Sequence, residues 1–112
     1  MTLESLEAYG ANTAEGMSRC MNDESFYLRM VDMTLADGNF EKLKDTMEAG
    51  NTAEAFSAVH ALKGALGNVS LTPIYEPVCE LTELLRGQSS PVDGGKELLE
   101  KILEQREKAL AL

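Results

Sequence analysis

The chain has 112 residues, of which 44% are hydrophobic and 26% are charged, a balance typical of one globular domain over residues 1–112. Its net charge of −9 argues against nucleic acid and anionic membranes as partners, because both attract clustered Lys and Arg side chains. The sequence shows neither an apolar run of membrane-spanning length nor a signal-peptide pattern at its N-terminus, so we expect a cytoplasmic protein.

Metal-ligating residues are few and scattered. The chain has one histidine and two cysteines, Cys20 and Cys79, with no CxxC spacing between them. Such a set does not supply the ligands of a metal site, and two distant thiols are most often small buried side chains. We therefore expect no metal and no cofactor in this chain.

Residues 1–21 are predicted to form an N-terminal extension of short helices. Residues 2–9 favour the first of these, and the spacing of Asn12 and Glu15 predicts a capping box that opens the second. The apolar side of the second helix is predicted to carry Met17 and Met21.

Residues 22–112 carry the periodicity of longer amphipathic helices, the first of which has Asn22 or Asp23 as its N-cap. The segment Asp37-Gly38-Asn39 predicts a break, and Gly50 is a plausible C-cap for the helix that follows it. The inward residues of these two helices are predicted to be Phe26, Met30 and Met33 with the neighbouring Tyr27 and Val31, and then Phe40, Leu43 and Met47.

Three further helices follow. The spacing of Asn51 and Glu54 repeats the capping box, and Thr72 with Pro73 predicts the next start, although Pro77 leads us to expect regular helix only from that residue. Gly87 is expected to end this helix before a polar loop over residues 88–95. The predicted apolar stripes are Ile74, Val78, Leu81 and Leu85, and then Leu98, Leu99, Ile102, Leu103 and Leu110; Glu97–Lys101 and Glu104–Lys108 are expected ion pairs.

Short links between amphipathic helices predict an all-α fold, an antiparallel four-helix bundle with additional short N-terminal helices. The only histidine, His60, lies in the middle of one of the predicted helices. On an ideal helix the residues Ala55, Val59, Leu62, Leu66 and Val69 fall within roughly 40° of one another and form the buried stripe. His60 lies about 140° from that stripe and therefore faces away from the core.

Two glycines share the outer face of this helix with the histidine. An exposed Gly lowers the stability of a helix by about 1 kcal/mol relative to Ala. The presence of Gly64 and Gly67 therefore indicates that a binding partner must approach the helix backbone closely. Phe56, Ser57 and Lys63 lie on the same face. Each feature alone is compatible with an ordinary solvated helix face, but their combination favours a functional site.

The segment His60-Ala61-Leu62-Lys63-Gly64 resembles the H-x-L-K-G signature of histidine-containing phosphotransfer (HPt) domains. Asn68 matches a position often filled by Asn in that family, and Gly67 is similar to a glycine of the related phosphotransfer domain of chemotaxis kinases. The motif spans about residues 52 to 70, and the order of the predicted helices resembles the family over nearly the whole chain. Ala65-Leu66 and Ser70-Leu71 depart from the small residues and the Gly-Ala pair common in the family.

The resemblance implies a phosphocarrier in a multistep His–Asp phosphorelay. His60 would accept a phosphoryl group from a receiver-domain aspartate or a kinase and pass it to another receiver, since a largely neutral imidazole is a competent nucleophile. Lys63 would offset the charge of the phosphoryl group, Gly64 would give steric access, and Phe56, Ser57 and Gly67 would belong to the docking surface. Response-regulator receiver domains and a sensor histidine kinase are the implied partners of a monomeric chain, with Mg²⁺ supplied by the receiver.

Two other functions stay open. A non-enzymatic helical adaptor, including a degenerate phosphotransfer domain, would dock receivers without accepting phosphate, although the intact His60, Lys63 and Gly64 argue against degeneracy. A hydrolase lacks support, because no Ser or Cys nucleophile motif accompanies His60. The chain carries no ATP-binding loop of the Walker type, so we expect no kinase activity. The residue that orients the second imidazole nitrogen is undetermined, with Thr82 and Glu83 as candidates.

Overall fold

The computed structural model describes all 112 residues and contains seven helices and no strand. The helices are α1 (Leu3–Tyr9), α2 (Thr13–Arg19), α3 (Glu24–Leu35), α4 (Asn39–Glu48), α5 (Thr52–Asn68), α6 (Thr72–Leu85) and α7 (Gly95–Leu110).

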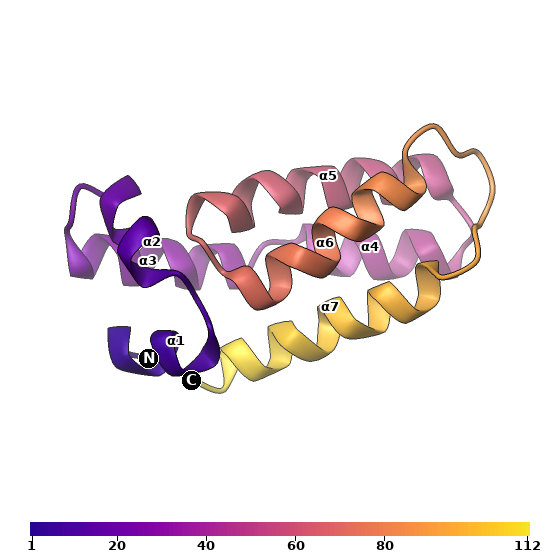
Figure 1. The fold of residues 1–112 in the computed structure, drawn as a ribbon. Helices are drawn as coiled ribbons and strands as arrows, with labels where there is room; N and C mark the ends of the chain where they lie inside the picture. The colour runs from indigo at the N-terminus through magenta and orange to yellow at the C-terminus, as the bar shows by residue number, and fades with distance from the viewer.

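The last four helices form an antiparallel bundle in which α5 packs between α4 and α6, and α7 packs on α6 (Figure 1). The links from α4 to α5 and from α5 to α6 span only residues 49–51 and 69–71, which forces each helix to return beside its predecessor. Figure 1 shows α3 leading into α4 along the same side of the molecule. The break predicted at 37–39 lies between them at 36–38, because Asn39 already begins α4. The elongated molecule measures 42 × 23 × 19 Å. The predicted all-α bundle with short N-terminal helices is confirmed.

Side chains at the predicted caps begin three of the helices. The side-chain oxygens of Asn12, Asp23 and Asn51 accept hydrogen bonds from the backbone N–H groups three residues later. The start of α6 differs from the prediction, because Leu71 is the N-cap and Thr72 the first helical residue. Pro77 also lies inside a continuous helix, so the expected late start is wrong.

The core is continuous through the bundle and contains 22 buried hydrophobic residues. The predicted stripes of α5 and α6 are buried, including Val59, Leu62 and Leu66 on α5 and Val78 and Leu81 on α6. On α3 the predicted face is rotated: Tyr27, Val31 and Leu35 are buried, whereas the side chain of Met33 is 60% exposed. Tyr27 takes the inward position because its hydroxyl reaches a carbonyl of another helix end, a contact that the sequence pattern does not reveal.

Two further predictions at helix ends are wrong. Met21 is 82% exposed because it lies in the left-handed turn after α2, with φ +57°, and not on the inner side of that helix. Leu110 is 50% exposed, and Ala109 faces the core instead. Of the two expected ion pairs on α7, the pair Glu104–Lys108 forms with an N–O distance of 3.3 Å, and the other does not.

Arg106 of α7 fastens the bundle to the break between α3 and α4. Its Nε donates to the Leu35 carbonyl at 2.9 Å, its Nη1 lies 3.0 Å from the Glu41 carboxylate, and its Cζ lies 4.5 Å from the centre of the Phe40 ring. The guanidinium thereby satisfies a carbonyl that the end of α3 leaves without a helical partner.

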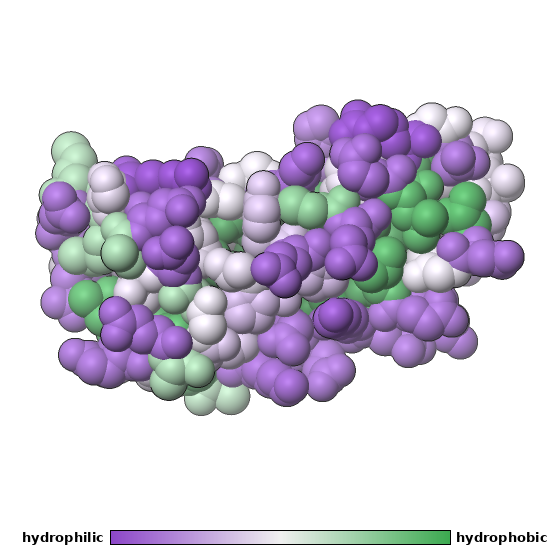
Figure 2. All heavy atoms as spheres, viewed as in Figure 1, coloured by the Kyte–Doolittle hydropathy of each residue, from purple (hydrophilic) through white to green (hydrophobic).

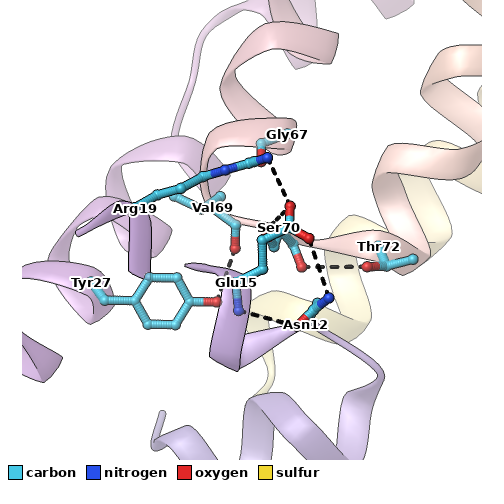
Figure 3. Close-up of polar contacts among 8 residues, drawn as sticks. All are labelled: Asn12, Glu15, Arg19, Tyr27, Gly67, Val69, Ser70 and Thr72. Atoms are coloured by element: carbon cyan, nitrogen blue, oxygen red, sulfur yellow. Dashed lines mark hydrogen bonds and ion pairs between the residues drawn. The ribbon is translucent and has the colours of Figure 1, made fainter. Parts of the chain in front are cut away.

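The N-terminal helices cover the C-terminal end of α5 (Figure 3). The Tyr27 hydroxyl donates to the Val69 carbonyl at 2.9 Å, and the Asn12 N–H donates to the Ser70 carbonyl at 3.0 Å. The Ser70 hydroxyl in turn lies 3.2 Å from the carboxylate of Glu15. The carbonyls at the end of α5 and in the following turn therefore find partners in the first 27 residues.

The surface in view is mainly hydrophilic, with a hydrophobic patch at the end of the molecule where the loop before α7 lies (Figure 2). None of the helices is both long enough and apolar enough to cross a membrane.

Candidate functional site

Helix α5 presents His60 near its middle. Ala55, Ala58, Val59 and Leu62 of this helix are buried in the core, whereas the His60 side chain is exposed. The helical geometry predicted from the sequence is therefore confirmed for the histidine and for the buried stripe. The apolar stripe fixes the rotation of the helix, and this rotation holds the imidazole toward solvent.

The aromatic ring of Phe56 is the immediate neighbour of the imidazole. The two ring centroids are 5.6 Å apart, and the ring planes meet at 85°, an edge-to-face arrangement. The imidazole forms no hydrogen bond within the chain. Ser57, one residue farther along the same helix, is exposed. Both imidazole nitrogens are thus free of intramolecular partners.

Lys63 and Gly64 lie one turn after the histidine. The Lys63 side chain is half-buried and forms no ion pair within the chain, so its ammonium group is not neutralised by a direct partner. A Cβ placed on Gly64 would find no atom within 4 Å. The absence of a side chain at Gly64 therefore relieves no clash inside the domain, and it leaves open space beside the imidazole.

Gly67 differs from Gly64. A Cβ at Gly67 would lie 3.1 Å from Cε1 of Tyr75 on α6, and the Gly67 carbonyl accepts a hydrogen bond from Arg19 (Figure 3). The sequence-based expectation that Gly67 points away from the helix packing is wrong. The structure explains this glycine by close packing against Tyr75, and its contact with a partner stays a prediction.

Helix α6 places a charged pair beside α5. The guanidinium of Arg86, the C-cap residue that follows α6, is bound to the Glu83 carboxylate through Nε at 3.2 Å and Nη2 at 3.0 Å. Hydrogen bonding and charge from Arg86 hold the pKa of Glu83 below its usual value, and the positive charge of Lys63 lowers this pKa further. Glu83 is therefore an ionised group that the positive charges of Arg86 and Lys63 stabilise.

Neither residue that we considered for orienting the imidazole binds it. Thr82 is fully buried, and its hydroxyl donates to the Val78 carbonyl of its own helix at 2.7 Å. Glu83 is engaged by Arg86 instead. Thr82 is thus wrong as a candidate, because its direction on α6 is toward the core.

Arg86 is the residue of this site that the sequence did not reveal. Its Cζ lies 5.3 Å from the centroid of the Phe56 ring, the same ring that meets His60. Arginine commonly stacks on an aromatic face in this way. The contact depends on the packing of α6 against α5, so no local pattern around His60 could have indicated it.

His60 lines none of the three main surface pockets. A cavity of about 510 Å³ is lined by residues such as Met47, Leu85, Val92 and Leu99 at the end of the bundle, and His60 is not among its lining residues. No group of three or more His, Cys, Asp or Glu side chains is placed to hold a metal ion. The exposed imidazole on the outer face of α5 is accessible to another macromolecule.

Comparison with protein families identifies the domain. The family model described as the Hpt domain matches residues 29–110, which covers α4 to α7 completely and most of α3. Searches of curated proteins and of solved structures each found no significant match. Because the family model covers well over half of the 112 residues, the chain belongs to the Hpt domain family.

Proposed function

We propose that this chain is a phosphocarrier that accepts a phosphoryl group on His60 and passes it to a receiver domain. Membership of the Hpt family gives the general role of phosphotransfer in a His–Asp phosphorelay. The observation that supports the specific residue is the presentation of the only histidine, exposed in the middle of α5, with open space at Gly64 beside it.

The transfer step follows from the chemistry of the imidazole. A neutral ring nitrogen of His60 attacks the phosphorus of an aspartyl phosphate on the receiver, so a P–N bond forms as the P–O bond to the carboxylate breaks. The aspartate leaves as a carboxylate, and the other ring nitrogen keeps its proton during the attack. The reverse reaction transfers the phosphoryl group to the aspartate of a second receiver. The receiver supplies Mg²⁺, which would bind phosphate oxygens on the partner's side of the complex.

The neighbouring residues have separate roles in this proposal. Lys63 offsets the negative charge of the transferring group, and its ammonium is free of an internal ion pair. Gly64 gives the partner steric access, and Phe56 and Ser57 belong to the surface that meets it. The partners are response-regulator receiver domains and a sensor histidine kinase, and the domain acts as a monomer without ATP chemistry of its own.

A transfer assay tests the proposal. The protein is incubated with a receiver domain carrying ³²P on its aspartate, and the label on each protein is followed with time. We expect label to move to this chain and to be lost in acid but retained in base, as is characteristic of a phosphoramidate. A protein that binds the phosphorylated receiver yet gains no label would be an adaptor, and the carrier function would be rejected.

Gly64 offers a second prediction. Gly64→Ala is expected to stabilise the domain by up to about 1 kcal/mol, because the position is helical and a Cβ meets no atom. Gly64→Gln is expected to preserve the melting temperature but to slow transfer by about tenfold or more, because the longer side chain obstructs the approach of the receiver.

The control for this pair is Ala53→Gln, which places the same side chain at an exposed position near the start of α5. Thermal unfolding and the rate of label transfer are measured for each variant. If Gly64→Gln transfers as fast as Ala53→Gln, Gly64 has no role in access.

A further inference from the structure

Three charged side chains lie near the face of α5 that carries His60, and only Lys63 belongs to the segment that resembles the HPt signature. Lys63 comes from α5, whereas Glu83 and Arg86 come from the end of α6. Arg86 is held at two points by Glu83, with distances of 3.2 and 3.0 Å, and its Nη1 makes no hydrogen bond within the chain. Half of the Arg86 side chain is exposed, so this free edge of the guanidinium is open to a ligand.

The Phe56 ring links this pair to the histidine. Its centroid lies 5.3 Å from Cζ of Arg86 and 5.6 Å from the centroid of the His60 ring. The guanidinium and the imidazole are therefore neighbours of the same ring. Two groups at such distances from one ring are separated by roughly 11 Å or less, about one Debye length at 0.1 M ionic strength, so the Arg86 charge acts on a phosphoryl group bound to His60. A phosphoryl group carries about −1.5 to −2 charges near neutral pH, more than Lys63 alone offsets.

Resting on the proposed function, we propose that Arg86 is a second cation of the phosphoryl site, which stabilises the phosphorylated form of His60 from α6. Glu83 fixes the guanidinium against Phe56, and its own negative charge opposes the phosphoryl group. The opposing charges of Arg86 and Glu83 thus shift the equilibrium constant for transfer of the phosphoryl group from the receiver to this domain. Guanidinium groups suit this task because they stay charged and bind phosphate oxygens through paired N–H groups.

The test uses the equilibrium distribution of ³²P between the receiver and this domain. Arg86→Gln removes a positive charge and is expected to lower the fraction on this domain, with a change in the equilibrium constant of about threefold. Glu83→Gln removes a negative charge and is expected to raise it by a similar factor, about threefold. Both shifts should shrink in 1 M salt, because mobile ions screen exposed charges.

The opposite signs distinguish this role from a purely structural one. Both substitutions break the same ion pair, so a structural role would move the equilibrium in the same direction in both variants. The matched control is Arg29→Gln, which removes an arginine whose Cζ lies 5.7 Å from the Phe26 ring on α3, and which should leave the distribution unchanged.

Changes of the same sign in Arg86→Gln and Glu83→Gln, or no change in either, would overturn the role of Arg86 while leaving His60 as the acceptor. A wild-type protein that takes no label from the phosphorylated receiver would overturn the proposed function as well, so the two failures are distinguishable.

Discussion

Replacing His60 with Gln is expected to abolish phosphoryl labelling and to leave the fold intact. The chain has no other histidine, so no second imidazole can accept the group, and labelling should fall by more than about two orders of magnitude. The exposed side chain forms no hydrogen bond, so the free energy of unfolding should change by no more than about 0.5 kcal/mol. Far-ultraviolet circular dichroism and thermal unfolding provide the check on folding.

The receiver provides an internal control for this variant. The phosphorylated receiver should lose its label at the same rate with the His60→Gln protein as it does alone. The wild-type protein should accelerate this loss by accepting the phosphoryl group. Acid-labile, base-stable label on the His60→Gln protein would show that another side chain is the acceptor.

Gly16→Ala is expected to destabilise the fold strongly although it adds only one methyl group. A Cβ at this buried position of α2 would lie 2.4 Å from Cε1 of Tyr27 and 2.7 Å from its hydroxyl oxygen. The Tyr27 ring is fully buried and hydrogen-bonded to the Val69 carbonyl, so it cannot move aside without losing that bond. The clash outweighs the helix propensity of Ala, and we expect a net loss of roughly 2 kcal/mol in the free energy of unfolding.

Chemical denaturation of Gly16→Ala and Gly64→Ala in parallel tests this expectation. The two substitutions make the same chemical change in a helix, but only Gly64 has open space around it. The midpoint should fall for Gly16→Ala and stay or rise for Gly64→Ala. Equal midpoints would mean that α2 does not pack closely on Tyr27.

The sequence was informative wherever one apolar stripe dominated a helix. On α5 the residues at helical spacing were all apolar on one side, so the burial of Val59 and Leu66 and the exposure of His60 followed from geometry. The side-chain caps at Asn12, Asp23 and Asn51 were equally local, because each cap bonds a backbone N–H three residues away. Interactions within single helices were therefore sufficient to predict that His60 faces solvent.

On α3, helical spacing alone did not show which of two overlapping apolar stripes is buried. Phe26, Met30 and Met33 form one face, and Tyr27 and Val31 belong to the next; both have apolar residues at helical spacing. The choice is made by a distant partner, since the Tyr27 hydroxyl is satisfied only where the end of α5 offers its Val69 carbonyl. Such long-range contacts leave no signal in the periodicity of a single helix.

The same limit applies to the site. His60, Lys63 and Gly64 follow one another on a single helix, so one segment of sequence brought them together. Arg86 reaches Phe56 only because α6 packs antiparallel on α5. Gly67 packs against Tyr75 of the same neighbouring helix, a contact that the position of Gly67 on its own helix does not indicate. The parts of the site contributed by α6 therefore required the tertiary structure.

The most direct test of His60 as the phosphoryl acceptor is to locate the phosphoryl group on the protein. The domain is labelled with ¹⁵N, phosphorylated by a phosphorylated receiver in the presence of Mg²⁺, and examined by ³¹P and ¹⁵N magnetic resonance under alkaline conditions. We expect a phosphoramidate ³¹P signal coupled to an imidazole nitrogen of His60, with the largest chemical-shift changes on the exposed face of α5 and at the end of α6. A phosphoryl signal with no coupling to an imidazole nitrogen, or no phosphoryl group on the protein at all, would show that His60 is not the acceptor.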